Sequence, residues 1–172
     1  EKRVIFFDVG SHFGETVKFF SKYLSINEFH CFEASPKNFI ILEKNIKRSK
    51  NKGICNLNNY GIGQDSYETF INQTQESSSS TINDINFESN YFLKKLKVLN
   101  ISDIKSYIQK VPIKIKSLDY YIKKNDIKII DILKIDTEGF ELEVLKGLKE
   151  NYNKVNFIYF EHHYDNMIKK NY

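Results

Sequence analysis

Cysteine is scarce in this sequence: Cys31 and Cys55 are the only two. They form neither a CxxC motif nor the spacing of a metal site. Both lie in stretches whose composition is typical of buried strands, so we interpret them as small core residues. Unpaired cysteines of this kind indicate a reducing compartment, and we expect a cytoplasmic protein without a disulfide framework.

Long apolar runs and arginine are also lacking. No run approaches the roughly 20 residues that cross a bilayer, so we expect no membrane span. Residues 1–9 (EKRVIFFDV) pass directly from charge into a strand-like run, which disfavours a secretory signal. Arginine occurs only at Arg3 and Arg48 although the net charge is +4. Because nucleic-acid readers favour arginine and the lysines are scattered, we interpret the charge as solvated surface and expect no nucleic-acid partner.

What the sequence does contain is an alternation of buried strands and amphipathic helices. Helical periodicity follows the strand-like runs, which predicts a doubly wound α/β fold. The right-handed crossover rule then favours one mainly parallel sheet with its core strands in the order 3-2-1-4-5. The five predicted core strands are 3–9, 28–33, 53–57, 129–135 and 155–160.

The middle of the chain is less regular. We expect further strands at 67–71 and 111–115, and Pro112 with its neighbouring lysines suits an exposed or edge strand. Residues 73–110, which include the polar stretch 77–81, are predicted to be a loop or lid insertion. The length of 172 residues fits a single domain, 1–172.

Acidic residues stand at the ends of four predicted strands. In a parallel sheet these carboxyl ends meet at one edge, where ligands bind. Capping of the following helix explains any one such carboxylate, but four on one rim favour a ligand site. The four residues are Asp8, Glu33, Asp136 and Glu161.

Two glycines bracket the turn after the first strand. Gly10 and Gly14 leave space for a ligand to approach the backbone, because neither has a Cβ atom. Their spacing differs from the G-x-G-x-x-G pyrophosphate cradle, and the turn lacks the P-loop lysine, which disfavours NAD and ATP. Glu33 follows Gly14 by roughly 20 residues, the spacing at which a carboxylate meets ribose hydroxyls. A nucleoside without pyrophosphate fits S-adenosylmethionine.

Five successive motifs resemble those of FkbM-type methyltransferases. They are DVGSHFGET at 8–16, FEASPKNF at 32–39, NYGIG at 59–63, LD at 118–119 and LKIDTEGFE at 133–141. The resemblance runs in order over nearly the whole chain. It implies a Rossmann-like class I methyltransferase fold, S-adenosylmethionine as methyl donor, and O-methylation of sugars, glycans or related metabolites.

The resemblance also implies where the donor binds. The glycine turn would surround the methionine part, Glu33 the ribose, and residues 59–60 the adenine side. This sequence departs from the family at His12, where Asn is commoner, and at Ala34, where Pro is. The implied donor-binding residues are Asp8, Gly10, Ser11, His12, Gly14, Glu33, Ala34, Asn59 and Tyr60.

Methyl transfer to a hydroxyl releases a proton, so a base assists it. Asp136, Glu138 and Glu161 are the catalytic candidates, with His162 and His163 behind them. Packing or surface placement is the plainer interpretation of the two histidines. As an alternative, the three acids and a histidine would hold a divalent cation, but no tight ligand spacing demands one and we expect no metal site.

Other functions and the chain's extent stay open. An inactive nucleotide- or S-adenosylmethionine-binding module is the main alternative, and a nicotinamide oxidoreductase is a third. The acceptor, a small molecule or glycan, and the oligomeric state are not specified by the sequence. Class I methyltransferases continue past their fifth strand with a helix and a hairpin, whereas only twelve residues follow Phe160. We therefore expect a domain truncated at both ends that lacks the C-terminal hairpin.

Overall fold

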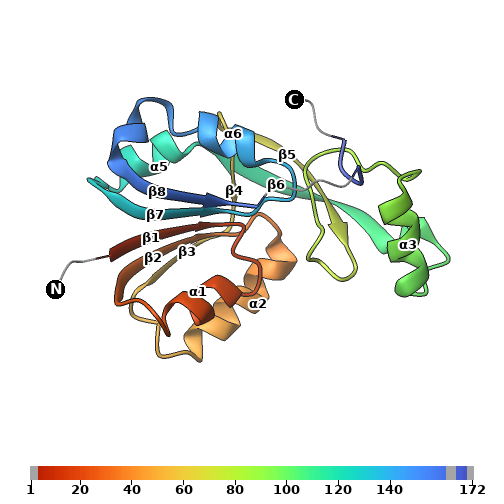
Figure 1. The fold of residues 1–172 in the computed structure, drawn as a ribbon, viewed down its shortest axis with the longest axis horizontal. Coiled ribbons are helices and arrows are strands. Elements are labelled where there is room, and N and C mark those ends of the chain that lie inside the picture. The colour runs from red at the N-terminus through yellow and green to blue at the C-terminus, as the bar shows by residue number, and fades with distance from the viewer. Residues whose placement is uncertain (1–3, 162–165, 170–172) are drawn as a thin grey trace.

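The centre of the computed structural model is a five-stranded sheet in the order β3-β2-β1-β7-β8 (Figure 1). The structure describes residues 4–161 and 166–169. All four neighbouring strand pairs are parallel, which confirms the predicted core order 3-2-1-4-5. The strands are β1 (Val4–Val9), β2 (Ile26–Phe32), β3 (Cys55–Asn58), β7 (Ile130–Ile135) and β8 (Val155–Phe160).

Helices cover both faces of this sheet (Figure 1). On one face lie α1 (Glu15–Phe20) and α2 (Pro36–Lys47), and on the other lie α5 (Leu118–Lys124) and α6 (Glu141–Lys146). The 3-10 turn η1 (Lys149–Lys154) leads into β8. This is the doubly wound architecture that the alternating sequence pattern predicts.

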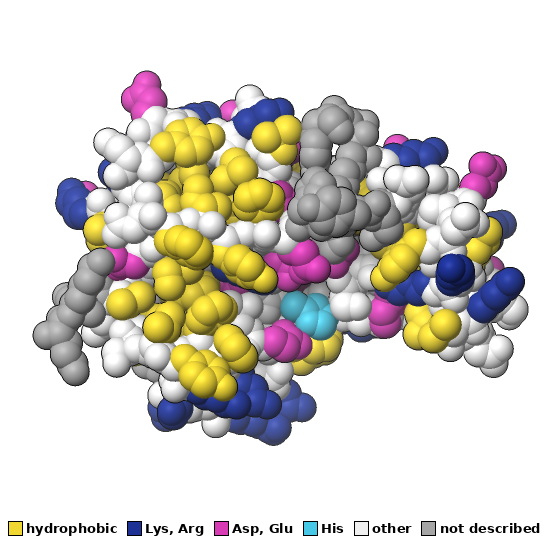
Figure 2. Space-filling model, viewed as in Figure 1, with side chains coloured by type: hydrophobic (Ala, Val, Ile, Leu, Met, Phe, Trp, Pro, Cys, Tyr) yellow, Lys and Arg dark blue, Asp and Glu magenta, His cyan; other side chains and the backbone are white. Residues whose placement is uncertain are grey.

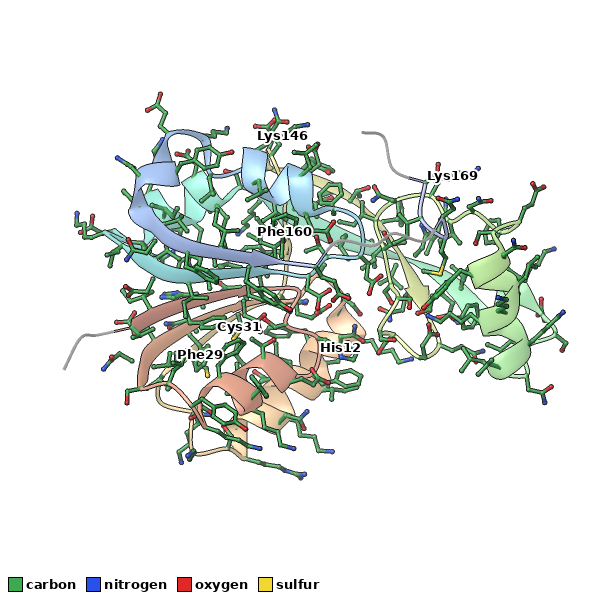
Figure 3. All side chains as sticks on the ribbon, in the orientation of Figure 1. His12, Phe29, Cys31, Lys146, Phe160 and Lys169 are labelled. Carbon is green, nitrogen blue, oxygen red and sulfur yellow. The ribbon has the colours of Figure 1, made fainter. Side chains whose placement is uncertain are left out.

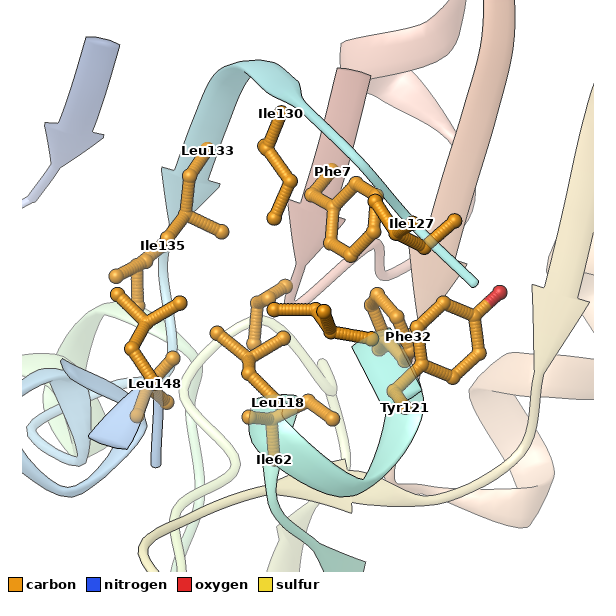
Figure 4. Close-up of a cluster of buried hydrophobic side chains, with 13 residues drawn as sticks. Phe7, Phe32, Ile62, Leu118, Tyr121, Ile127, Ile130, Leu133, Ile135 and Leu148 are labelled. Atoms are coloured by element: carbon orange, nitrogen blue, oxygen red, sulfur yellow. The ribbon is translucent and has the colours of Figure 1, made fainter. Parts of the chain in front are cut away.

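The two faces of the sheet have separate apolar cores because successive strand residues point to opposite sides. On β1, Phe6 packs with Phe29 and Leu42 under α1 and α2. Phe7 instead packs with Leu133 and Leu118 on the other side, in the cluster drawn in Figure 4. Burial on both faces explains the almost continuous apolar composition of β1.

A second, three-stranded sheet has the order β4-β6-β5. Its strands are β4 (Gly61–Ile62), β5 (Tyr67–Thr74) and β6 (Ile108–Lys116), and β5 pairs with β6 in antiparallel register. The predicted strands at 67–71 and 111–115 are confirmed, and in the described part of the chain β4 joins the other side of β6 only at Ile115 and Lys116. Among the described residues Pro112 meets β5 alone, so this part of β6 has one unpaired side, which suits a proline.

The insertion at 73–110 consists of the ends of β5 and β6 and two helices, joined by turns and irregular backbone. It contains the helices α3 (Asn90–Val98) and α4 (Ile104–Tyr107), at the end of β5 and β6 far from the large sheet (Figure 1). Phe92 of α3 packs on Tyr107 in a small core that also includes Met167. Among the described residues, no helix is both long and apolar enough to cross a membrane.

Candidate functional site

A cavity of about 340 Å³ lies at the carboxyl ends of β1, β2 and β7. This volume is in the range of small-molecule sites. Histidine and acidic side chains gather in the middle of the face shown in Figure 2, and His12 lies on the side of the large sheet that faces β5 and α3 (Figure 3). The predicted site residues that line the cavity are Gly10, Ser11, His12, Glu33, Ala34, Asp136, Glu138 and Glu161.

Four predicted donor residues do not line this cavity, and two of them belong to the β1 region. Asp8 is fully buried. Gly14 faces α2, since a Cβ atom placed on it would lie 3.1 Å from Leu42 Cδ1. Asp8 and Gly14 therefore belong to the buried structure beneath the cavity and not to its surface.

The other two residues outside the cavity are Asn59 and Tyr60. Asn59 Nδ2 donates a hydrogen bond to the backbone oxygen of Glu33 at 2.9 Å. The Tyr60 ring packs against the apolar core under α5 and α6, which contains Phe7 and Leu118. Lys116 Nζ lies 4.3 Å from the centroid of the Tyr60 ring. Neither side chain lines the cavity, so each can affect it only by positioning the residues that it contacts.

Glu33 is held rigidly at the end of β2. Its Oε2 accepts a hydrogen bond from the backbone N–H of His12 at 2.8 Å, and its Oε1 accepts one from that of Ser35 at 2.9 Å. The residue is 6% exposed. Burial raises the pKa of Glu33 to about 7, although the two backbone N–H groups oppose the shift. The carboxyl group thus changes charge close to neutral pH.

The loop of residues 10–14, called the glycine loop below, touches the loop that follows β7. Gly10 has a φ of 83°, and a Cβ atom on it would lie 1.8 Å from the backbone oxygen of Asp136. Only glycine fits here, for both reasons. The N–H groups of Gly10 and Ser11 both donate to the Phe32 carbonyl at 3.0 Å, which fixes the glycine loop on β2.

His12 joins the glycine loop to the insertion. Its Nε2 lies 2.7 Å from Ser77 Oγ, and its Nδ1 lies 3.2 Å from Glu15 Oε1. Ser77, Ser78 and Ser80 line the cavity but were not predicted as site residues. The polar stretch at 77–81 was their only sequence signal.

The loop of residues 136–140, called the acidic loop below, is fastened from two sides. Glu141 Oε1 accepts hydrogen bonds from the backbone N–H groups of Thr137 and Gly139, at 3.1 and 3.0 Å. From the insertion, Thr81 Oγ1 donates to the Glu138 carbonyl at 2.7 Å. Glu138 itself has a φ of 54°, a left-handed conformation that these bonds hold in place.

Carboxyl groups crowd one wall of the cavity. Burial raises the pKa of Glu138 to about 8, with the charges of Asp136 and Glu161 adding to the shift. Glu138 is therefore mostly protonated at neutral pH. His162 and His163 lie outside the described residues, and within the described ranges no cluster of His, Cys, Asp or Glu is arranged to hold a metal ion.

Lys134 of β7 also lines the cavity and was not predicted as a site residue. Its Nζ lies 3.2 Å from both Asp8 Oδ1 and Asp136 Oδ2. The sequence contains little indication of this role, because a single lysine within a strand is usually an exposed surface residue. The ammonium partly balances the charge of the acidic wall.

Comparison with known proteins identifies the family. The chain matches the Methyltransferase FkbM domain over residues 8–170. Its fold is similar to the crystal structure of a methyltransferase FkbM from Methylobacillus flagellatus KT, with a TM-score of 0.53 and 15% identity over 86% of this chain. The chain spans only 29% of that protein's chain. No curated protein matches this chain. Because the domain match extends from the end of β1 to beyond β8, this chain belongs to the FkbM methyltransferase domain family.

Proposed function

We propose that this chain binds S-adenosylmethionine and directs its methyl group to a hydroxyl of a sugar, a glycan or a related metabolite. Membership of the FkbM family supports a methyltransferase function. The choice of donor rests on the cavity, and the choice of a hydroxyl acceptor rests on the carboxyl groups that line its wall.

Glu33 is the observation on which the donor assignment depends. A carboxylate offers about four acceptor positions, and the His12 and Ser35 N–H groups occupy one on each oxygen. Both oxygens therefore keep capacity for the two vicinal hydroxyls of a ribose. Because the backbone bonds fix the carboxylate in advance, little conformational entropy is lost when a ribose binds.

The remaining walls fit the other parts of the donor. The apolar side chains of Ile62, Ile71 and Ile82 offer contacts for an adenine ring. The glycine loop would hold the methionine part. Gly10 serves this loop structurally and leaves no space for a ligand there, because the Asp136 backbone oxygen fills the place of its missing Cβ atom. Asn59 would act indirectly, by fixing the backbone of Glu33.

Bound S-adenosylmethionine supplies an electrophilic methyl group on a sulfonium centre. The acceptor oxygen forms a bond to that methyl carbon as the carbon–sulfur bond breaks, and the hydroxyl proton passes to a base. Asp136 is the candidate base, with Glu161 beside it on the same wall. Glu138, mostly protonated at neutral pH, is suited to donate a hydrogen bond that orients the acceptor.

The test separates donor binding from transfer. Calorimetric titration with S-adenosylmethionine and, in parallel, NAD examines the donor. Incubation with methyl-labelled donor and a panel of mono- and oligosaccharides then examines transfer. Saturable S-adenosylmethionine binding with label in the sugars supports the proposal. Binding without transfer to any hydroxyl favours an inactive binding module, and preferred NAD binding contradicts the donor assignment.

A further inference from the structure

Three oxygen atoms from different parts of the chain converge on the Lys134 ammonium. Asp8 Oδ1 and Asp136 Oδ2 both lie 3.2 Å from Nζ, and the Gly10 carbonyl accepts a hydrogen bond from it at 3.1 Å. The Lys134 side chain is only 9% exposed. The ammonium thus donates one hydrogen bond to the Gly10 carbonyl and lies within ion-pair distance of both carboxylates.

The three partners lie in three different structural units. Asp8 is the direct neighbour of Lys134 in the β1–β7 register. Gly10 belongs to the glycine loop, and Asp136 belongs to the acidic loop. Lys134 thus joins the strand pair to both loops that border the cavity.

Lys134 stays charged in this position. Burial opposes its charged form, but the carboxylates of Asp8 and Asp136 outweigh that effect and raise the pKa of Lys134. A charged ammonium has no lone pair for nucleophilic chemistry, and the Gly10 carbonyl and the two carboxylates hold this one in place. Lys134 therefore contributes to the site either by fixing the positions of its partners or by its positive charge.

We propose that Lys134 is a positioning residue that ties the glycine loop to Asp136 and thereby sets the distance between the methyl donor and the candidate base. The identity of the donor in this inference rests on the proposed function. The competing explanation is that Lys134 only neutralises the buried Asp8 charge. In that case the contacts with Gly10 and Asp136 would have no effect of their own.

A double substitution separates the two explanations. Lys134→Met alone would leave the Asp8 carboxylate buried without its counter-ion, and such a loss is strongly destabilising. Asp8→Asn removes the charge that requires neutralising. The informative comparison is therefore Asp8→Asn/Lys134→Met against Asp8→Asn alone, with Lys128→Met as a control at an exposed lysine that pairs with Asp126.

Hydrogen–deuterium exchange is the first readout because it needs no ligand. If Lys134 ties the loops together, peptides covering residues 10–16 and 136–141 exchange faster in the double variant than in Asp8→Asn. S-adenosylmethionine affinity, the second readout, falls at least tenfold in the same comparison. Equal exchange and equal affinity in the two variants would overturn the inference. The Lys128→Met control should match the wild type in both readouts.

Two further outcomes are distinguished. If the wild type does not bind S-adenosylmethionine, the proposed function fails, whereas the exchange comparison still decides whether Lys134 ties the loops. If the double variant does not fold, Lys134→Arg replaces it. Arginine keeps the positive charge beside Asp8, but a planar guanidinium cannot satisfy three converging oxygens in the same way. Faster loop exchange than in the wild type supports the inference, and unchanged exchange overturns it.

Discussion

The backbone oxygen of Asp136 occupies the space that a side chain on Gly10 would need, 1.8 Å from the ideal Cβ position. Gly10→Ala must therefore displace one of the two loops, and it also places alanine at a φ of 83°. We expect the free energy of unfolding to fall by at least about 2 kcal/mol and donor affinity to fall at least tenfold. Chemical denaturation and calorimetric titration measure the two effects.

Gly53→Ala is the matched control for this substitution. No atom lies within 4 Å of a Cβ atom built on Gly53. Its stability and donor affinity should equal those of the wild type. A Gly10→Ala protein as stable as Gly53→Ala would show that the two loops are not in contact in solution.

Removing the Glu33 carboxylate should weaken donor binding. Glu33→Ala leaves ribose hydroxyls without an acceptor in a buried site, a loss on the scale of about 1–3 kcal/mol. Glu43→Ala, on the exposed side of α2 where it pairs with Lys47, is the control. Titration calorimetry at fixed pH compares the two. Equal donor affinity in both variants would mean that Glu33 serves only the backbone N–H groups of His12 and Ser35.

Stability should depend on pH through Glu138. Its pKa is about 8 in the folded chain against 4.5 for an unperturbed glutamate, so the folded state binds more protons between these values. The free energy of unfolding therefore falls as pH rises from about 4.5 to about 8. Glu138→Gln removes this contribution and should flatten the profile in denaturant melts at pH 5, 6, 7 and 8. A variant profile as steep as that of the wild type would contradict the assigned shift.

The hydrogen bond between His12 and Ser77 should stabilise the contact between the glycine loop and the insertion. Ser77→Ala removes a 2.7 Å bond, and we expect the free energy of unfolding to drop by about 0.5–1.5 kcal/mol. Ser66→Ala, at an exposed position directly before β5, provides the comparison. Thermal melts compare the two variants with the wild type. A melting curve of Ser77→Ala that coincides with those of Ser66→Ala and the wild type would show that the hydrogen bond does not stabilise the fold.

The core of the fold follows from local sequence signals. The run at 3–9 predicts β1 because burial on both faces requires nearly continuous apolar residues. Once the parallel order is set, the ends of β1, β2 and β7 must meet, which brings Gly10, Glu33 and Asp136 together without further information. Periodicity and topology are sufficient for this part of the site.

The missed residues lack a local signal. Ser77 reaches His12 from 65 positions away, and Lys134 reaches Gly10 from 124 positions away. Such contacts depend on how the insertion folds over the cavity and on the β1–β7 register, neither of which a short window of sequence contains. For Tyr60 the family resemblance implies a place on the adenine side of the donor, whereas in the structure its ring packs against the apolar core under α5 and α6.

Titration of the wild-type chain with S-adenosylmethionine, repeated with Glu33→Ala and with NAD, tests the central claim most directly. The cavity geometry predicts saturable one-site binding of S-adenosylmethionine, weakened by about 1–3 kcal/mol (about 5-fold to 150-fold) in Glu33→Ala, and no comparable binding of NAD. Absence of S-adenosylmethionine binding, or tighter binding of NAD, would contradict the assignment of this cavity as a methyl-donor site.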